Sequence, residues 1–491
     1  MKVGNNRSSL LYHIVSKTNF RNVWHQPFFA DYRRSCHQQP EVMVIWLIFA
    51  FSLYVGVFQL LTKNVECHPF PVPSTSDVPD PSRFNNLDVT VDGSKSSLHT
   101  FREASPALTS LDGITKEHRI FSTTIHEVTF LVKQRNMDEL TRILHDISDS
   151  ASENYGNHLT KEDIDQLTGN PESHHEVVAY LKAAGATLII DQTHGEIIRA
   201  QAPIALWERI LNTEFYSYSL QPSMESNQLE IVQQNSLKFI GSEQYYVPLG
   251  LDAHVSSVAN VIDVPRVHQR VLQKHIHSSA FSEASIYYEG YMSPQLLNDI
   301  HGIYDNTGHP RATQLAFETV QNYFSPEDLT TFQRFYGLPI RAVNQSIGNM
   351  TRSAAWCKAK GYVVCAESNL DIQFMSAVAD TPTIHYYFKW SSFSLFLSLL
   401  FNSGNPPLVV SISYTSDEYL TPQGEHDAFT ENAIKLGAMG VTIVACSGDD
   451  GVSSPRARSD ITKCGYTPLY PSGCPYVLTV GATQVISHII A

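Results

Sequence analysis

Two acidic side chains separated by four positions are the first candidates for chemistry. On a helix, Glu367 and Asp371 of the segment ESNLD would lie on one face, a turn apart. Phe374, Met375 and Val378 continue that face, so both carboxyl groups are expected to point inward. Burial raises carboxyl pKa values, and two close acids share a proton as a coupled pair. Such a pair can act as a general base in acid solution. Two solvated acids stabilised by the dipole at a helix N-terminus are the alternative.

A second acidic site is the glycine-bounded turn SGDDG at 447–451, which directly follows the apolar run VTIVAC. Glycines allow sharp backbone geometry, so Asp449 can be directed across the edge of a sheet. A calcium loop and an ordinary surface turn are the alternatives. The twelve-residue ligand spacing of a calcium loop is absent after Asp449. The pattern assigns no role to Asp450.

A parallel sheet would place these acids together. The apolar runs Pro407–Tyr414 and Val441–Cys446 are typical of buried strands, and Gln423–Leu436 between them has helical spacing. This order predicts a right-handed βαβ unit. The run Gly361–Ala366 with the helix after it predicts a further βα unit. Both acidic sites would then follow the carboxyl ends of strands, where open α/β sheets collect functional groups.

A compact α+β domain is predicted ahead of the sheet. Its expected elements are a strand at Ile125–Val132, helices at Met137–Ile147 and Pro171–Ala184, a hairpin formed by Ala186–Ile190 and Gly195–Ala200, a helix at Pro203–Leu211 and a strand at Glu214–Leu220.

These motifs, in this order, resemble the sedolisin (serine-carboxyl peptidase) family of the tripeptidyl-peptidase I kind. GYVVCAESNLDIQFMSAVA is similar to its Glu-x-x-x-Asp helix, VVSISY to the following core strand, ACSGDDG to its oxyanion-aspartate turn and YPSGCPYVLTVGAT to the next strand. HEVTFLVKQRNMDEL and SENYGNHLTKEDI resemble the family's activation domain. The resemblance runs from about Ile120 to the C-terminus. It implies a ferredoxin-like α+β pro-domain followed by an incomplete subtilisin-like α/β peptidase domain with a parallel sheet.

The resemblance also implies residue roles in an acid serine-type peptidase zymogen, either a tripeptidyl-peptidase or an endopeptidase. Glu367 would be the general base, Asp371 its partner, and Asp449 a protonated acid that stabilises the oxyanion. A neutral carboxyl group donates a hydrogen bond where a carboxylate would repel the developing charge. Substrates would be peptides or proteins, and the pro-domain would be an intramolecular inhibitor.

The resemblance departs from the family after this turn. The family's Gly-Thr-Ser nucleophile motif does not occur in the 40 residues that follow Gly451. Without a serine, the acids have nothing to activate. We therefore expect this chain to be inactive as written, with no metal ligands, because the Ca²⁺ site of the intact family member would also be missing from it. The alternatives are a non-catalytic fragment or pseudo-peptidase whose pro-domain inhibits a full-length relative, and a non-enzymatic protein anchored at a surface.

An uncharged run of about twenty residues, Val42–Leu61, follows Arg33 and Arg34 and predicts a signal peptide or signal anchor at 43–67. A buried core helix is the alternative. Met43 is an alternative start, which would leave 1–42 as an untranslated extension. The further boundaries are a Pro- and Ser-rich linker at 68–117, the activation domain at 118–250, an activation linker at 251–285 and the truncated peptidase domain at 286–491.

Charge and cysteine content restrict the partners and the compartment. The net charge of -14 argues against nucleic acid as a partner. Contact with a membrane is expected only through residues 42–61. Seven cysteines fit an oxidising secretory route to a secreted, lysosomal or vacuolar location, with a membrane-anchored form as the alternative. The close spacings predict Cys357–Cys365 and Cys464–Cys474 disulfides rather than metal sites, and Cys446 is expected to be a buried thiol. Sequons mark Asn344 and Asn349 as glycosylation candidates.

Overall fold

The computed structural model describes residues 99–482, apart from 111–112, 191–195, 221–236, 266–291, 305–307, 310–311, 320–321, 349 and 389–391. We call 99–265 the N-terminal lobe and 292–482 the C-terminal lobe. The apolar segment Val42–Leu61 lies outside the described residues. None of the helices described here combines the length and the apolar character of a membrane-spanning segment.

The N-terminal lobe is built from antiparallel sheets. Its four-stranded sheet has the order β4-β5-β3-β9, with strands β3 (Ile125–Val132), β4 (Thr187–Ile190), β5 (Ile197–Pro203) and β9 (Val255–Ala259). The helices of this lobe are α5 (Met137–Ser148), α6 (Lys161–Thr168), α7 (Pro171–Ala184), α8 (Ile204–Ile210) and α9 (Leu249–Asp252). Of these, α7, α8 and α9 pack on strands of the sheet, whereas α5 and α6 pack on each other. Along the chain these elements follow one another as β, α, β, β, α, β, when α5 to α7 are taken together and α8 is taken together with α9.

Two smaller sheets complete this lobe. One joins β2 (Ile114–Arg119), β6 (Tyr216–Leu220) and β7 (Leu237–Gly241), and the other pairs β1 (His99–Ala104) with β8 (Gln244–Pro248). A short helix, α4 (Pro106–Ser110), follows β1. Strand β1, helix α4 and the start of β2 therefore lie within 68–117, which the sequence indicated as a linker. In the same way, β9 lies within 251–285 because it pairs with the central strand β3.

The C-terminal lobe contains a six-stranded sheet whose pairs are all parallel. Its order is β11-β12-β10-β13-β15-β17. The strands are β10 (Gln314–Glu318), β11 (Gln345–Ile347), β12 (Thr383–Tyr387), β13 (Val409–Ile412), β15 (Thr442–Cys446) and β17 (Leu478–Val480). The two-residue strands β14 (Ser416–Asp417) and β16 (Leu469–Tyr470) pair separately. The prediction of a mixed α/β fold with a parallel sheet is confirmed.

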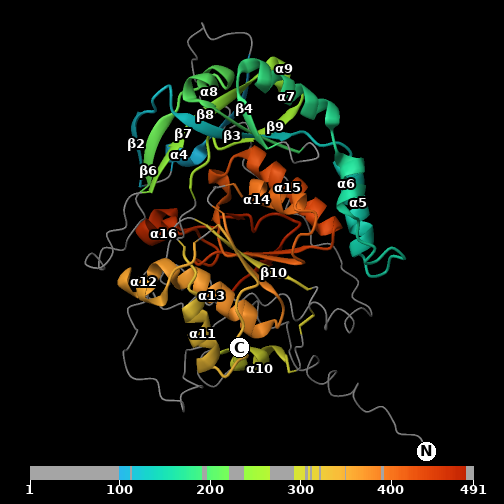
Figure 1. Ribbon diagram of the computed structural model, residues 1–491, viewed down its shortest axis with the longest axis vertical. Helices are drawn as coiled ribbons and strands as arrows, with labels where there is room; N and C mark the ends of the chain where they lie inside the picture. The colour runs from blue at the N-terminus through green and yellow to red at the C-terminus, as the bar shows by residue number, and fades with distance from the viewer. Residues whose placement is uncertain are drawn as a thin grey trace, which may run out of the picture.

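Helices cover the two faces of this sheet (Figure 1). One layer contains α14 (Phe393–Asn402) and α15 (Gln423–Ala438), which lie between the sheet and the N-terminal lobe. The other contains α10 (Pro294–His301), α11 (Pro326–Phe335) and α13 (Val363–Val378). Shorter helices are α12 (Ala354–Ala359) and α16 (Arg456–Ser459). Since β13, α15 and β15 follow in order with parallel strands, the predicted βαβ unit is present.

The predicted strand at Gly361–Ala366 is wrong. Helix α13 already begins at Val363, so Glu367 lies in a helix and not after a strand. Two positive φ angles, 83° at Gly361 and 59° at Tyr362, turn the chain sharply before the helix. The amide of Tyr362 donates to the carbonyl of Cys357, and Cys365 is joined to Cys357 by a disulfide. This hydrogen bond and this disulfide hold the segment close to Cys357. They exclude the extended conformation that the two adjacent valines of the run favour by themselves.

Candidate acidic site

Helix α13 buries both members of the predicted acid pair. Glu367 is 7% exposed and Asp371 is fully buried. Burial raises the pKa of Asp371 to about 7, against a hydrogen bond from Ser413 that lowers it. The Ser413 hydroxyl donates to Asp371 Oδ2 at 2.7 Å. Asp371 therefore retains its proton into the neutral range.

Asp449 lies in the turn after β15, with Gly448 in the left-handed region at a φ of 91°. Burial raises the pKa of Asp449 to about 6; the charge of Arg458 opposes this shift and the charge of Asp450 adds to it. Arg458 Nη2 lies 3.7 Å from Asp449 Oδ2. Asp449 is therefore mostly protonated below about pH 6, when a carboxyl group can donate a hydrogen bond.

Asp450, to which the sequence assigned no role, holds the arginine beside this turn. Arg458 Nε and Nη2 donate to the two oxygens of Asp450 at 2.6 and 2.8 Å. This two-point contact fixes the guanidinium plane and leaves Asp449 at a longer distance. Among the described residues, Asp449 Oδ1 is buried without a hydrogen-bond partner. The two adjacent aspartates of this turn therefore differ. Asp450 is paired with a cation, and Asp449 has a carboxyl oxygen available to a ligand.

All three candidate acids act on one buried thiol at the carboxyl end of β15. Burial raises the pKa of Cys446, and the charges of Asp449, Glu367 and Asp371 raise it further. Asp371 is hydrogen-bonded to Ser413 just after β13, and Asp449 follows the neighbouring parallel strand β15, so the sheet places these acids at one edge. Cys446 is buried, as the sequence predicted, and its raised pKa leaves it a neutral thiol.

Sequence reasoning missed two further polar groups at this edge. Glu318 ends the buried strand β10, and its Oε2 accepts a hydrogen bond from the Tyr414 hydroxyl at 2.6 Å. Burial raises the pKa of Tyr414, and the charges of Glu318, Glu367 and Asp371 raise it further. Ser413 is the other group. The available signal for Glu318 was an acidic residue at the end of the largely apolar run QLAFE. No feature of the neighbouring sequence indicates Ser413.

The arrangement supports acid–base chemistry in mildly acidic water. A fully buried carboxyl group with a pKa of about 7 stays neutral there and can stabilise an ionised neighbour through a shared proton. A second carboxyl group that is neutral below about pH 6 can donate to an oxygen that gains negative charge. These carboxyl groups could therefore serve as base, partner and electrophilic donor in one reaction.

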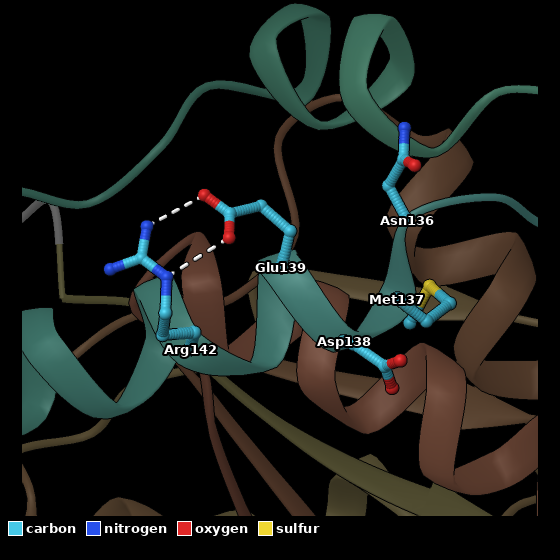
Figure 2. Close-up of a pocket in the computed structure, with 5 residues that line it drawn as sticks. All are labelled: Asn136, Met137, Asp138, Glu139 and Arg142. Carbon is cyan, nitrogen blue, oxygen red and sulfur yellow. Dashed lines mark hydrogen bonds and ion pairs between the residues drawn. The ribbon is translucent and has the colours of Figure 1, made fainter.

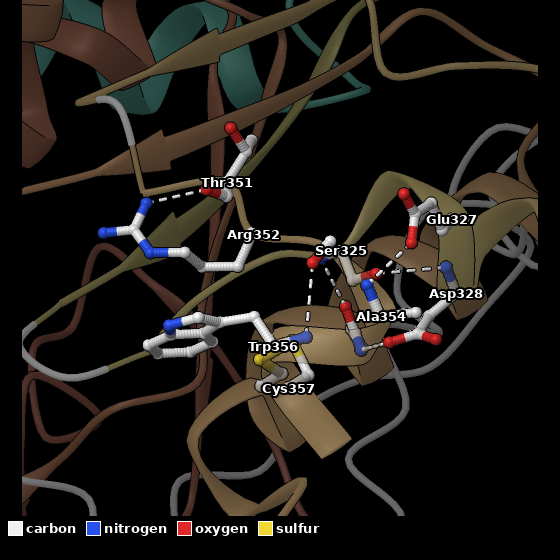
Figure 3. The surroundings of a disulfide bond; sticks show 11 residues. Ser325, Glu327, Asp328, Thr351, Arg352, Ala354, Trp356 and Cys357 are labelled. Atoms are coloured by element: carbon white, nitrogen blue, oxygen red, sulfur yellow. Dashed lines mark hydrogen bonds between the residues drawn. A yellow bond between two sulfur atoms is a disulfide. The ribbon is translucent and has the colours of Figure 1, made fainter. Parts of the chain in front are cut away.

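The predicted Cys357–Cys365 disulfide is present, with a Cα–Cα distance of 5.9 Å. It links α12 to the first turn of α13, two residues before Glu367. Figure 3 shows its surroundings, in which Trp356 and Arg352 lie beside the bond. Next to it, Asn369 of α13 accepts from the Ser325 amide at 2.9 Å and donates to Asp328 at 3.0 Å. The bond and this amide together fix the start of the helix that carries the acid pair.

The other predicted disulfide is wrong, because Cys464 and Cys474 are not joined. Cys474 is half-buried against the core, with its sulfur 3.8 Å from Thr430 Oγ1, whereas Cys464 is exposed. Of the two sequons, Asn344 is exposed ahead of the edge strand β11, and Asn349 lies outside the described residues. Glycosylation at both stays a prediction.

A hollow of about 570 Å³ lies at the N-terminus of α5, far from these acids in the sequence. Figure 2 shows its lining residues, which are Asn136, Met137, Asp138, Glu139 and Arg142. Arg142 pairs with Glu139 through contacts of 2.6 and 2.9 Å on the exposed helix surface. None of the buried acids lines this hollow, so it is not part of the acidic site. Within the described ranges, no cluster of three or more His, Cys, Asp or Glu side chains could hold a metal ion.

Comparison with known proteins gives matches to both lobes. The family described as "Pro-kumamolisin, activation domain" matches residues 112–264. Physarolisin of Physarum polycephalum is 27% identical over 73% of this chain and 60% of its own length. Tripeptidyl-peptidase sed1 of Aspergillus fumigatus is 25% identical over 76% and 66%, and tripeptidyl-peptidase 1 of Canis lupus familiaris is 25% identical over 78% and 65%. The chain therefore spans 60 to 66% of the length of these relatives.

Among solved structures, a Pseudomonas sedolisin described as a serine-carboxyl proteinase aligns with a TM-score of 0.25 and 18% identity. The alignment covers 36% of this chain and 54% of that one.

Proposed function

This chain is a homologue of the sedolisin-type peptidases and carries their pro-kumamolisin activation domain, and we propose that it provides the pro-domain and the acid–base groups of an acid serine-type peptidase zymogen. Peptides or proteins would be its substrates, and the N-terminal lobe its intramolecular inhibitor. The observation that carries the proposal is the buried acid pair of α13 together with Asp449 at the same edge of the sheet.

In this proposal Glu367 accepts the proton of a serine hydroxyl as that oxygen attacks the substrate carbonyl. Asp371 retains the shared proton of the pair and keeps Glu367 in place. Asp449, neutral below about pH 6, donates a hydrogen bond to the oxygen of the tetrahedral intermediate. Glu367 then returns the proton to the leaving amine. The printed sequence contains no Gly-Thr-Ser motif, so no nucleophile is assigned within it.

The test begins with the reading frame beyond the codon of Ala491. If it encodes a Gly-Thr-Ser motif, the extended protein should cleave peptides in acid. Removing a donor to the oxyanion is expected to lower kcat by roughly 100- to 1,000-fold, so Asp449→Asn should show a loss of that size. Glu367→Gln should also abolish most of the activity, whereas the exposed Asp138→Asn should not. A frame without the motif, or full activity of Asp449→Asn, contradicts the proposal.

The finer features of the fold are part of the same proposal. We propose that the N-terminal lobe is a ferredoxin-like domain, which its β-α-β-β-α-β order and its strand order support. We propose that the C-terminal lobe is the first part of a subtilisin-like domain. A secretory route is supported by the Cys357–Cys365 disulfide, since such bonds persist in oxidising compartments. A calcium site in a longer form of the protein stays a prediction.

A second candidate function follows from the position of the family match, which lies in 112–264. The N-terminal lobe would then act on a related peptidase in trans, without catalysis by this chain. The test is to incubate the full chain with tripeptidyl-peptidase 1 and to follow peptide cleavage near neutral pH. Inhibition that persists in Glu367→Gln supports this function, and its absence counts against it.

A further inference from the structure

The two lobes meet over an apolar surface formed by α5 and α6 on one side and α14 and α15 on the other. Leu140, Leu144 and Ile164 of the N-terminal lobe belong to the same hydrophobic cluster as Phe401 and Ala433 of the C-terminal lobe. The close approach extends to the backbone, because the amide of residue 159 donates to the carbonyl of residue 438 at 2.8 Å. Such a surface provides attraction but little selectivity, since apolar contacts are not directional.

A charged pair is buried within this apolar surface. Lys435 of α15 is 1% exposed, and Glu196, directly ahead of β5, is 7% exposed. The Lys435 ammonium contacts the Glu196 carboxylate, so a cation from one lobe meets an anion from the other. A buried charge that loses its partner is strongly unfavourable, whereas a matched pair is close to neutral relative to apolar side chains.

Each charge is also hydrogen-bonded by the opposite lobe. Glu196 Oε2 accepts from Ser398 Oγ at 3.2 Å and from Asn402 Nδ2 at 3.1 Å, both on α14. In return, Lys435 Nζ donates to Gln134 Oε1 of the N-terminal lobe at 2.8 Å. The polar groups are therefore satisfied only when the two lobes are docked in this register.

A second lysine and its acid face the same buried region from α6. Lys161, itself buried, pairs with Asp165 at 2.5 Å. The Phe401 ring lies 4.8 Å from the Lys161 ammonium and 5.2 Å from that of Lys435. Burial lowers the pKa of Lys435, an effect that Asp165 opposes and Lys161 strengthens, so the ammonium form is unfavourable here unless an anion pairs with it. With Glu196 and Asp165 opposite two lysines, the charges balance only while Glu196 is in place.

We propose that Glu196 and Lys435 form a charge lock by which helices α14 and α15 select this chain's own N-terminal lobe as their partner. The lock rests on the proposed roles of the two lobes as pro-domain and peptidase domain. A foreign activation domain that places an apolar or basic side chain at the position of Glu196 leaves Lys435 buried and unpaired. The lock rejects such a domain even where its apolar surface fits.

The experiment is a charge-reversal cycle on the full chain, using Glu196→Lys, Lys435→Glu and the two changes together. Hydrogen exchange of the amide of residue 159, which is hydrogen-bonded across the interface to the carbonyl of residue 438, reports how often the lobes separate. Each single change places two like charges in the interface and is expected to raise this exchange roughly 100- to 1,000-fold. The double change restores opposite charges and should return exchange to within about ten-fold of the starting protein. Because no peptidase activity is needed, failure of the lock is distinguishable from failure of the proposed function.

The matched control is the exposed pair of Glu139 and Arg142 on α5, the same interface helix (Figure 2). Reversing either of its charges should change exchange by less than about three-fold, because exposed pairs contribute little. The proposal is overturned if reversal at 196 or 435 has the same small effect, or if the double variant exchanges as fast as the faster single one. Should a reversal unfold the chain, Glu196→Gln, Lys435→Gln and the pair of changes form the same cycle with neutral side chains. The neutral pair must then exchange more slowly than either single change.

Discussion

Replacing Asp371 by asparagine should stabilise the protein at alkaline pH and leave its stability in acid nearly unchanged. Asparagine keeps the shape and can still accept the hydrogen bond from Ser413, but it cannot ionise. In the folded protein burial raises the pKa of Asp371 from 3.8 to about 7. Between these values the folded state binds more protons than the unfolded chain, so stability falls as the pH rises.

The size of the effect follows from the shift. A rise of roughly three pKa units at about 1.4 kcal/mol per unit corresponds to about 4 kcal/mol of stability lost above pH 7. Asp371→Asn removes this loss. We therefore expect the free energy of unfolding to increase by up to about 4 kcal/mol at pH 8 and by less than about 1 kcal/mol at pH 4.

Guanidinium unfolding of both proteins at pH 4 and pH 8 measures this difference. Asp138→Asn, at an exposed position of α5, serves as the matched control and should show no comparable dependence on pH. Equal changes at the two pH values would mean that Asp371 does not resist ionisation in the folded state. Destabilisation at pH 8 would show that the carboxylate form is the one that the fold requires.

Three other changes test the surroundings of the site. Arg458→Gln removes a charge that lowers the pKa of Asp449, so this pKa should rise above about 6. Carbon NMR of the carboxyl group measures it, and an unchanged or lower pKa would show that Arg458 does not act on Asp449. Cys357→Ser opens the short loop to Cys365 and should lower the free energy of unfolding by about 2 to 3 kcal/mol. Relative to the starting protein, hydrogen exchange should increase more in the first turns of α13 than in β13. Phe317→Ala leaves a cavity among the rings that surround this side chain and should cost about 3 to 5 kcal/mol in guanidinium unfolding, while a cost below about 1 kcal/mol would mean that the core closes around it.

Local patterns predicted the elements whose sequence signals were long and periodic. The strand, helix and strand around α15 were found because apolar residues recur at strand and helix periods over forty residues. The Gly361–Ala366 strand failed because β-branched residues in a short run do not outweigh a disulfide closure and two left-handed residues. The Cys464–Cys474 pair failed because spacing alone does not show which cysteine is drawn into the core.

The sequence by itself determined which acids are available and where they lie along the chain, since an i, i+4 spacing on a helix and a glycine-bounded turn after a strand are local features. The tertiary structure decided what those acids can do. Their pKa values depend on burial beneath segments distant in the sequence, on Ser413 for Asp371 and on Arg458 for Asp449. The pairing of Glu196 with Lys435 likewise joins residues 239 positions apart. Desolvation and charge act through space, so these properties exist only once the chain has folded.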